Sequence, residues 1–226
     1  MAELTTASVA EALYRVTSRI AEAGGDPKDV TIVAVTKGFG QEAVVAALEA
    51  GCSDIGENYA QELVAKAPAA GGARLHFLGG IQRNKVSRLA SLVGLWQSVD
   101  RLEAGQAIAR HSPGAEILVQ VDLMEGSFVG RSGVALDAVP DLARALTEMG
   151  LNVKGLMAIG PPPPADPEPR FRRVAELRDS LGLVELSMGM SDDLEAAVRA
   201  GTTMVRIGRA LFGDRPKNHS RAIPAD

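Results

Sequence analysis

The chain has 226 residues, of which 46% are hydrophobic and 23% charged, and its formal net charge is -4. The scattered Lys and Arg residues form no basic patch of the kind that binds nucleic acid or an anionic membrane. One cysteine, Cys52, excludes an internal disulfide and suits a reducing compartment. The amino terminus lacks a signal-peptide pattern, and no apolar run reaches the roughly 18 residues that span a bilayer. We therefore expect a cytoplasmic monomer that binds neither nucleic acid nor membrane.

Short runs of strand-forming residues alternate with alanine-rich helical patterns along the chain. A first helix is predicted over 4–23, where Val9, Leu13, Val16 and Ile20 share one face. Eight strands are predicted after it, over 30–36, 53–55, 74–78, 95–99, 116–122, 153–159, 183–187 and 203–207. Helices are predicted between them, over 41–50, 59–66, 84–92, 101–110, 136–149, 169–180 and 192–200.

This alternation predicts an α/β fold, a single-domain (β/α)8 TIM barrel over 1–226 with an extra amino-terminal helix. An open doubly wound sheet is the alternative, but eight strands would make it large for this length. The polar segment 214–226 contains two prolines, and we expect it to be disordered.

Chemistry in such barrels gathers where the strands end. The residues at the predicted strand ends are Lys37, Glu57, Asn58, Gly79, Gly80, Gln82, Met157, Gly160, Ser187, Gly189, Arg206 and Gly208. One lysine, one arginine, an asparagine, a serine and several glycines are therefore expected on one rim.

The ends of the seventh and eighth strands have the composition of a phosphate site. Ser187 supplies a hydroxyl, Gly208 supplies backbone N–H groups before a helix, and Ser191 is expected to cap the helix that follows it. Loops at these positions of a barrel frequently hold a phosphate, because exposed N–H groups favour an anion. The structural alternative is that the glycines only make tight turns.

Lys37 ends a buried strand, "VTIVAVTK", and is followed by two glycines that flank Phe39. Partial desolvation there lowers the pKa of an amine and makes it nucleophilic, as a Schiff base to an aldehyde requires. A solvated lysine that has merely left the sheet is the alternative. Arg206 lies two residues before Gly208 and faces the same way. It could bind a carboxylate, a phosphate or a cofactor ring nitrogen, or it could simply pair with Glu57.

Other candidate residues favour structural roles. His76 lies within a predicted strand and is expected to be a satisfied core histidine, and Cys52 is expected to be an inert small hydrophobe. Three scattered histidines give no metal-ligand spacing, and Asp192 with Asp193 fits a helix start.

Several strings together resemble one known family. They are "AVTKGFG", "DIGENYAQEL", "LHFLGGIQRNKV", "GLMAIGP" and "LSMGMSDDLEAAVRAGTTMVRIGRALFG". They are similar, in order and spacing, to the pyridoxal phosphate homeostasis proteins, over about 4–213. These proteins are barrels similar to the amino-terminal half of bacterial alanine racemase.

The resemblance implies that the chain holds pyridoxal 5'-phosphate (PLP) as a Schiff base on Lys37. It also implies cofactor-binding roles for the residues Lys37, Asn58, Ser187, Arg206, Gly208 and Arg209. Arg206 matches the arginine that faces the pyridine nitrogen, where a cation disfavours ring protonation and weakens the electron sink. Three residues depart from the common pattern, and they are Phe39, Arg209 and Asp122.

The resemblance therefore implies a PLP-binding protein of PLP homeostasis, without robust turnover, that exchanges PLP with PLP-dependent apoenzymes. A PLP-dependent amino-acid racemase is the second hypothesis. Racemisation needs a second base opposite Lys37, and the two tyrosines, Tyr14 and Tyr59, are not expected to face it. The third hypothesis is an aldolase-like barrel that uses Lys37 against a sugar phosphate.

Overall fold

The structure is a computed structural model that describes residues 4–124, 132–163 and 165–215. Eight parallel strands pair in chain order, and β8 pairs back to β1, so the sheet closes into a barrel. The strands are β1 (Thr31–Val35), β2 (Asp54–Glu57), β3 (Arg74–Phe77), β4 (Leu95–Val99), β5 (Glu116–Val121), β6 (Asn152–Ala158), β7 (Glu185–Ser187) and β8 (Met204–Ile207). The predicted (β/α)8 barrel is confirmed, and the open doubly wound sheet is wrong.

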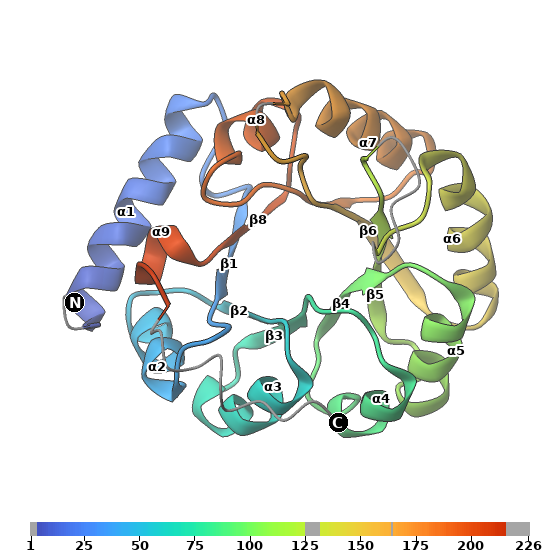
Figure 1. Cartoon of the computed structure of the whole chain (residues 1–226), viewed down its shortest axis with the longest axis horizontal. Coiled ribbons are helices and arrows are strands. Elements are labelled where there is room, and N and C mark those ends of the chain that lie inside the picture. The colour runs from blue at the N-terminus through green and yellow to red at the C-terminus, as the bar shows by residue number, and fades with distance from the viewer. Residues whose placement is uncertain (1–3, 125–131, 164, 216–226) are drawn as a thin grey trace.

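Helices surround the barrel, as Figure 1 shows in a view down the chain's shortest axis. They are α1 (Thr6–Glu22), α2 (Gln41–Glu49), α3 (Ala60–Lys66), α4 (Arg83–Leu89), α5 (Leu102–His111), α6 (Val139–Glu148), α7 (Glu168–Ser180), α8 (Leu194–Arg199) and α9 (Arg209–Phe212). Two short 3-10 helices, η1 (Ala67–Ala70) and η2 (Leu136–Ala138), complete the elements that the structure describes. Because β2 runs to Glu57, this glutamate belongs to the strand and not to the loop after it.

The extra amino-terminal helix α1 lies in the ring of helices between α8 and α2, with α9 on its inner side (Figure 1). Its start is fixed by a capping box in which Thr5 and Ser8 exchange side-chain and backbone hydrogen bonds. Its buried face consists of Val9, Ala12, Val16 and Ile20. None of the described helices is long and apolar enough to cross a membrane.

The apolar core has two layers. Side chains that point into the barrel form a small cluster made of Val33, Leu95, Leu118, Met157 and Met204. A larger cluster fills the space between the strands and the helices. The two layers follow from the alternation of side chains along each strand, which sends successive residues to opposite faces. The inner layer also contains several polar side chains, and a chain of hydrogen bonds connects them to Arg206 on the wall of the candidate site.

Candidate cofactor site

A cavity of about 470 Å³ lies where the strands end. Its wall is formed by Val35, Lys37, Phe39, Asn58, Leu78, Met157, Ile159, Met190, Ser191, Asp192, Arg206, Gly208, Arg209, Gly213, Asp214 and Arg215. Five of the six residues predicted to bind the cofactor are therefore brought together here, and Ser187 is the exception. The expected disorder of 214–226 falls mostly on residues outside the described ones, but Asp214 and Arg215 line this cavity.

Lys37 follows β1 and enters the cavity from the turn that Gly38 makes. Gly38 has a φ of 78°, a left-handed conformation that side chains larger than hydrogen rarely adopt. Within the described residues no hydrogen bond engages the Lys37 amine. Burial is the main reason that the pKa of Lys37 lies below its ordinary value, and the charges of Arg215 and Arg206 lower it further. A larger fraction of the amine is therefore neutral at a given pH, as a nucleophile requires.

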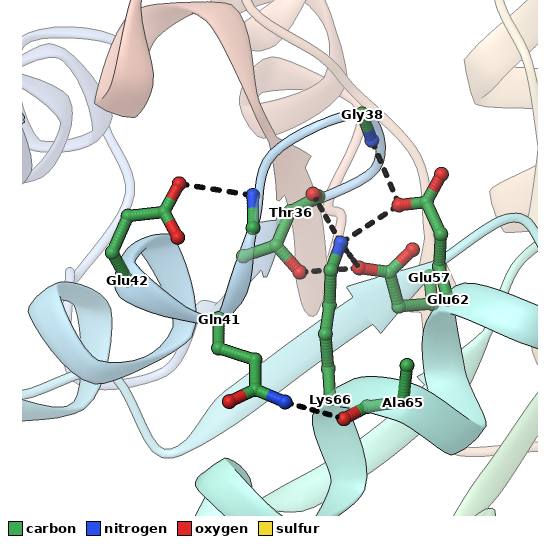
Figure 2. A network of polar contacts seen from close by, with 9 residues as sticks. Thr36, Gly38, Gln41, Glu42, Glu57, Glu62, Ala65 and Lys66 are labelled. Carbon is green, nitrogen blue, oxygen red and sulfur yellow. Dashed lines mark hydrogen bonds and ion pairs between the residues drawn. The ribbon is translucent and has the colours of Figure 1, made fainter. Parts of the chain in front are cut away.

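A buried ion cluster holds the backbone on both sides of Lys37 (Figure 2). The Lys66 ammonium donates to Glu57 Oε1 at 2.6 Å, to Glu62 Oε2 at 2.7 Å and to the Thr36 carbonyl at 2.8 Å. The Gly38 N–H donates to Glu62 Oε2 at 2.8 Å. Residues before and after Lys37 are thus tied to one cluster that is itself removed from water.

Asn58 lies directly after β2 and presents its amide to the cavity. Its Oδ1 atom is buried and has no partner within the described part of the chain. The backbone at this point is fixed by close packing, because a Cβ atom on Gly79 would lie 1.8 Å from the Asn58 carbonyl oxygen. A buried, unsatisfied amide atom costs free energy that a bound polar ligand would recover.

Ser187 does not line the cavity. It ends β7, is fully buried, and donates its hydroxyl to Gln97 Oε1 at 2.7 Å inside the barrel. The serine on the cavity wall is Ser191, whose Oγ accepts from the Ala210 N–H at 3.1 Å. The prediction that Ser191 caps a helix is wrong, since α8 begins at Leu194 after Asp193.

Arg206, on β8, is buried and has no carboxylate partner among the described residues. Its guanidinium donates to the Ser187 hydroxyl and carbonyl, both at 2.8 Å, and to the Ala158 carbonyl at 2.9 Å. Burial lowers the pKa of Arg206 to about 10, so the side chain stays charged at neutral pH. The alternative in which Arg206 pairs with Glu57 is wrong, because Glu57 pairs with Lys66.

A chain of hydrogen bonds continues from Ser187 through the barrel interior. Gln97 Nε2 lies 2.7 Å from His76 Nδ1, and His76 Nε2 lies 2.8 Å from Asp54 Oδ1. An arginine can only donate, so the Ser187 hydroxyl oxygen accepts a hydrogen bond from Arg206 while its O–H donates to Gln97. At the other end of the chain of hydrogen bonds, His76 Nε2 donates to Asp54. Burial lowers the pKa of His76 although Asp54 opposes this, which favours the neutral ring. The prediction of a satisfied core histidine is confirmed.

Gly208 and Arg209 line the cavity at the end of β8. Among the residues that the structure describes, no acceptor takes the backbone N–H of Gly208 or Arg209. The Arg209 guanidinium pairs with Asp192 outside the barrel interior. Arg209 therefore offers its backbone N–H to the cavity while its side chain is already engaged.

The remaining sequence candidates have structural roles. Cys52 is buried, and burial raises the pKa of its thiol to about 11, as expected of an inert cysteine. No group of three or more metal-ligating side chains occurs in the described ranges. Lys66 was missed by the sequence reasoning, and its only signal was the spacing of four residues from Glu62 on a short helix.

Comparison with known proteins identifies the family of the chain. Residues 10–216 match the family described as alanine racemase, N-terminal domain. The pyridoxal phosphate homeostasis protein of Pseudomonas aeruginosa is 40% identical over 224 residues, which cover 92% of this chain and 96% of that protein. The chain belongs to the pyridoxal phosphate homeostasis protein family.

Other similar proteins include a further homeostasis protein, a related structure with PLP bound, and an enzyme that shares only the fold. The homeostasis protein of Escherichia coli is 32% identical over 230 residues, covering 92% of this chain and 95% of its own. PipY of Synechococcus elongatus, solved with PLP bound, is 27% identical with a TM-score of 0.79, over 91% of this chain and 100% of PipY. Alanine racemase of Bacillus anthracis shares the barrel at 18% identity and a TM-score of 0.69, over 96% of this chain and 58% of the racemase.

Proposed function

We propose that this chain is a PLP-binding protein of PLP homeostasis that attaches the cofactor to Lys37. The observation that carries the proposal is the position of the Lys37 amine, which has a lowered pKa, in one cavity with two backbone N–H groups; within the described residues, neither the amine nor these N–H groups have a hydrogen-bond partner. When bound, PLP supplies an aldehyde that condenses with a primary amine, and its phosphate requires N–H and hydroxyl donors. The residues of the cavity offer both.

Each cavity residue has a distinct role in this proposal. Gly208 and Arg209 donate their backbone N–H groups to the phosphate, and the hydroxyl of Ser191 takes the place that the sequence assigned to Ser187. Asn58 holds a polar edge of the ring with its unsatisfied amide. Arg206 faces the ring nitrogen as a donor. Because a guanidinium does not give up its proton, it disfavours protonation of that nitrogen and weakens electron withdrawal by the ring.

We further propose that the chain has no significant racemase activity. Racemisation needs a base on each face of the substrate carbon, and Lys37 serves one face. Tyr14 is 73% exposed on α1, and Tyr59 is 44% exposed at the start of α3. Neither tyrosine lines the cavity formed by the described residues. The role that fits this site is to hold PLP and exchange it with PLP-dependent apoenzymes.

The visible spectrum of the purified protein tests PLP binding. We expect a yellow protein, and we expect borohydride to link the cofactor covalently to Lys37, as located by peptide mass spectrometry. Lys37→Ala should abolish the adduct, whereas Lys28→Ala, at an exposed lysine, should retain it. A reduced adduct found mainly on another lysine would contradict the assignment.

Incubation of the PLP-loaded protein with L-alanine in deuterated water separates the carrier from the racemase. We expect slow exchange of the α-proton and no accumulation of the D-isomer. Rapid exchange together with D-alanine would replace the carrier proposal with the racemase.

A further inference from the structure

The ion cluster beneath Lys37 contains a second lysine that the proposed function does not use. Lys66, on the last turn of α3, is 4% exposed, and Glu57, on β2, is 1% exposed. A buried lysine is rare unless its charge is paired, because desolvation of an isolated ammonium is costly. This cluster contacts the two residues that flank Lys37, through the Thr36 carbonyl and the Gly38 N–H.

All the donors of Lys66 are occupied. An ammonium has three protons, and Lys66 uses them on the Thr36 carbonyl and on one oxygen each of Glu57 and Glu62. Thr36 also donates its hydroxyl to Glu57 Oε1 at 2.6 Å. Lys66 is therefore held as a charged, fully bonded group. It cannot compete with Lys37 as a nucleophile.

Glu57 keeps one free acceptor. Its Oε2 atom is buried and has no partner within the described residues, although Oε1 takes two hydrogen bonds. Burial raises the pKa of this carboxyl group, and Lys66 opposes the rise. Without Lys66, a charged Glu57 would be a buried and uncompensated carboxylate, which is stable only if another cation pairs with it.

Lys37 is the cation that lies next to this cluster. The charged groups that influence it come from β2, α3, β8 and the segment after α9, and they are Glu57, Glu62, Arg206 and Arg215. The other charged residues of the cavity wall are Asp192, Arg209 and Asp214. The carboxylates favour the charged form of Lys37, whereas burial and the arginines favour the neutral amine. Lys66 pairs with both carboxylates, so its positive charge offsets their effect on the pKa of Lys37.

We propose that Lys66 is a positioning residue that keeps Lys37 reactive, by engaging the Glu57 and Glu62 carboxylates that would otherwise pair with the Lys37 amine. The same contacts fix Thr36 and Gly38, the residues on either side of Lys37 (Figure 2). This inference rests on the proposed function in one respect, which is that PLP is attached to Lys37.

The test measures the reactivity of Lys37 without PLP. The cofactor-free full-length chain is labelled with trace acetic anhydride between about pH 6 and 11, and labelling at each lysine is followed by peptide mass spectrometry. In the wild type we expect a Lys37 midpoint below the ordinary amine value of 10.5, and we expect Lys66 to resist labelling. A Lys66 that labels as readily as the exposed Lys28 would overturn the proposal.

Variants separate charge from structure. Lys66→Met should raise the Lys37 midpoint by about one pH unit, because an opposite charge nearby favours the ammonium. Lys66→Arg, which keeps the charge, should stay near the wild type. The uncharged combination Lys66→Met, Glu57→Gln and Glu62→Gln should also return to the wild-type midpoint. An unchanged midpoint in Lys66→Met, or no recovery in the combination, would overturn the proposal.

Lys66→Met alone could fail to fold, and a second pair of variants covers that case. Lys66→Met with Glu62→Gln differs from the uncharged combination only in the charge of Glu57. A higher Lys37 midpoint in the former supports the proposal, and equal midpoints contradict it. PLP titration of the wild type reports separately on the proposed function, because labelling requires no cofactor.

Discussion

Two buried cations flank the cavity, and their surroundings differ. Lys66, beneath the β1–β2 side, is bound by two carboxylates and a carbonyl. Among the described residues, Arg206, on β8, is bound by neutral acceptors, which are the Ser187 hydroxyl and two carbonyls. Both side chains are less than 10% exposed, so burial alone does not distinguish them.

We interpret Lys66 as a structural cation and propose Arg206 as a cation that binds a ligand. Carboxylates neutralise Lys66 and use all its donors, so it contributes to the fold. Neutral acceptors leave the charge of Arg206 uncompensated, and its guanidinium, with five N–H donors, still has donors for a ligand. A bound group that carries electron-rich atoms would therefore gain more from Arg206 than from Lys66. Variants of the two cations and of their neighbours test this contrast.

Lys66→Met should have the largest effect on stability. Removing one partner of a buried ion pair leaves an uncompensated charge and typically costs about 3–5 kcal/mol of unfolding free energy. Urea denaturation measures the loss, and Lys28→Met, at an exposed site, serves as the control with an expected change within about 0.5 kcal/mol. A loss of less than about 1 kcal/mol of unfolding free energy would contradict a structural role for Lys66.

Arg206→Met should affect PLP affinity more than stability, unlike Lys66→Met. The variant removes a buried charge but also leaves the Ser187 and Ala158 acceptors without their donor, so we expect a stability loss of about 1–3 kcal/mol, smaller than that of Lys66→Met. PLP affinity should fall roughly ten- to hundredfold, because a hydrogen bond from a charged group is worth about 1.5–3 kcal/mol. Equilibrium titration with PLP measures the affinity. An unfolded variant, or one with unchanged affinity, would contradict the contrast between the two cations.

Substitutions of Ser191 and Ser187 should likewise differ, the first mainly in PLP affinity and the second mainly in stability. Ser191→Ala should weaken PLP binding by about tenfold, as expected for loss of a hydrogen bond to an anionic group. Ser187→Ala should cost about 1 kcal/mol of stability and weaken binding only a few-fold, because Ser187 reaches the cavity only through Arg206. Paired PLP titrations and urea denaturations of the two variants check the order. The reverse order would restore Ser187 as the phosphate ligand.

The smallest expected effect is on the pH dependence of stability. The pKa of Lys37 is lower in the folded than in the unfolded chain, so the unfolded state binds more protons between the two values. Lys37 should therefore make the free energy of unfolding rise as the pH increases toward 10.5, by no more than about 1 kcal/mol because the side chain is partly exposed. Arg206 acts in the same direction, so the measurement is the difference between wild type and Lys37→Met. A wild-type curve with no steeper rise than the variant would contradict the lowered pKa.

The sequence predicted the barrel and the lysine for the same physical reason. Strand and helix patterns alternate eight times, and residues at the ends of parallel strands must meet at one end of a closed sheet. Lys37, Asn58, Arg206, Gly208 and Arg209 each lie at such an end, so their convergence required no knowledge of loop geometry.

The differences between the sequence analysis and the structure involve features that strand ends do not determine. Ser187 is the last residue of β7 and points into the interior, whereas Ser191 reaches the cavity because Gly189, with a φ of 93°, turns the loop. Lys66 was missed because lysine is normally exposed, and its burial depends on Glu57 and Thr36 from other elements. Three-dimensional pairing of this kind leaves almost no trace in a single sequence.

The depth of the Lys66 cluster also determines how the site responds to ionic strength. Mobile ions screen exposed charges beyond about 8 Å at physiological salt, but they screen buried pairs much less. The pairs on the surface, such as Arg144 with Asp141, should therefore contribute less in the cell than in dilute buffer. The cluster beneath Lys37 should be almost unaffected, because Lys66 and Glu57 are excluded from the solvent. The contribution of this cluster to the reactivity of the Lys37 amine should then change little with salt, whereas the contribution of the exposed Arg215 should decrease.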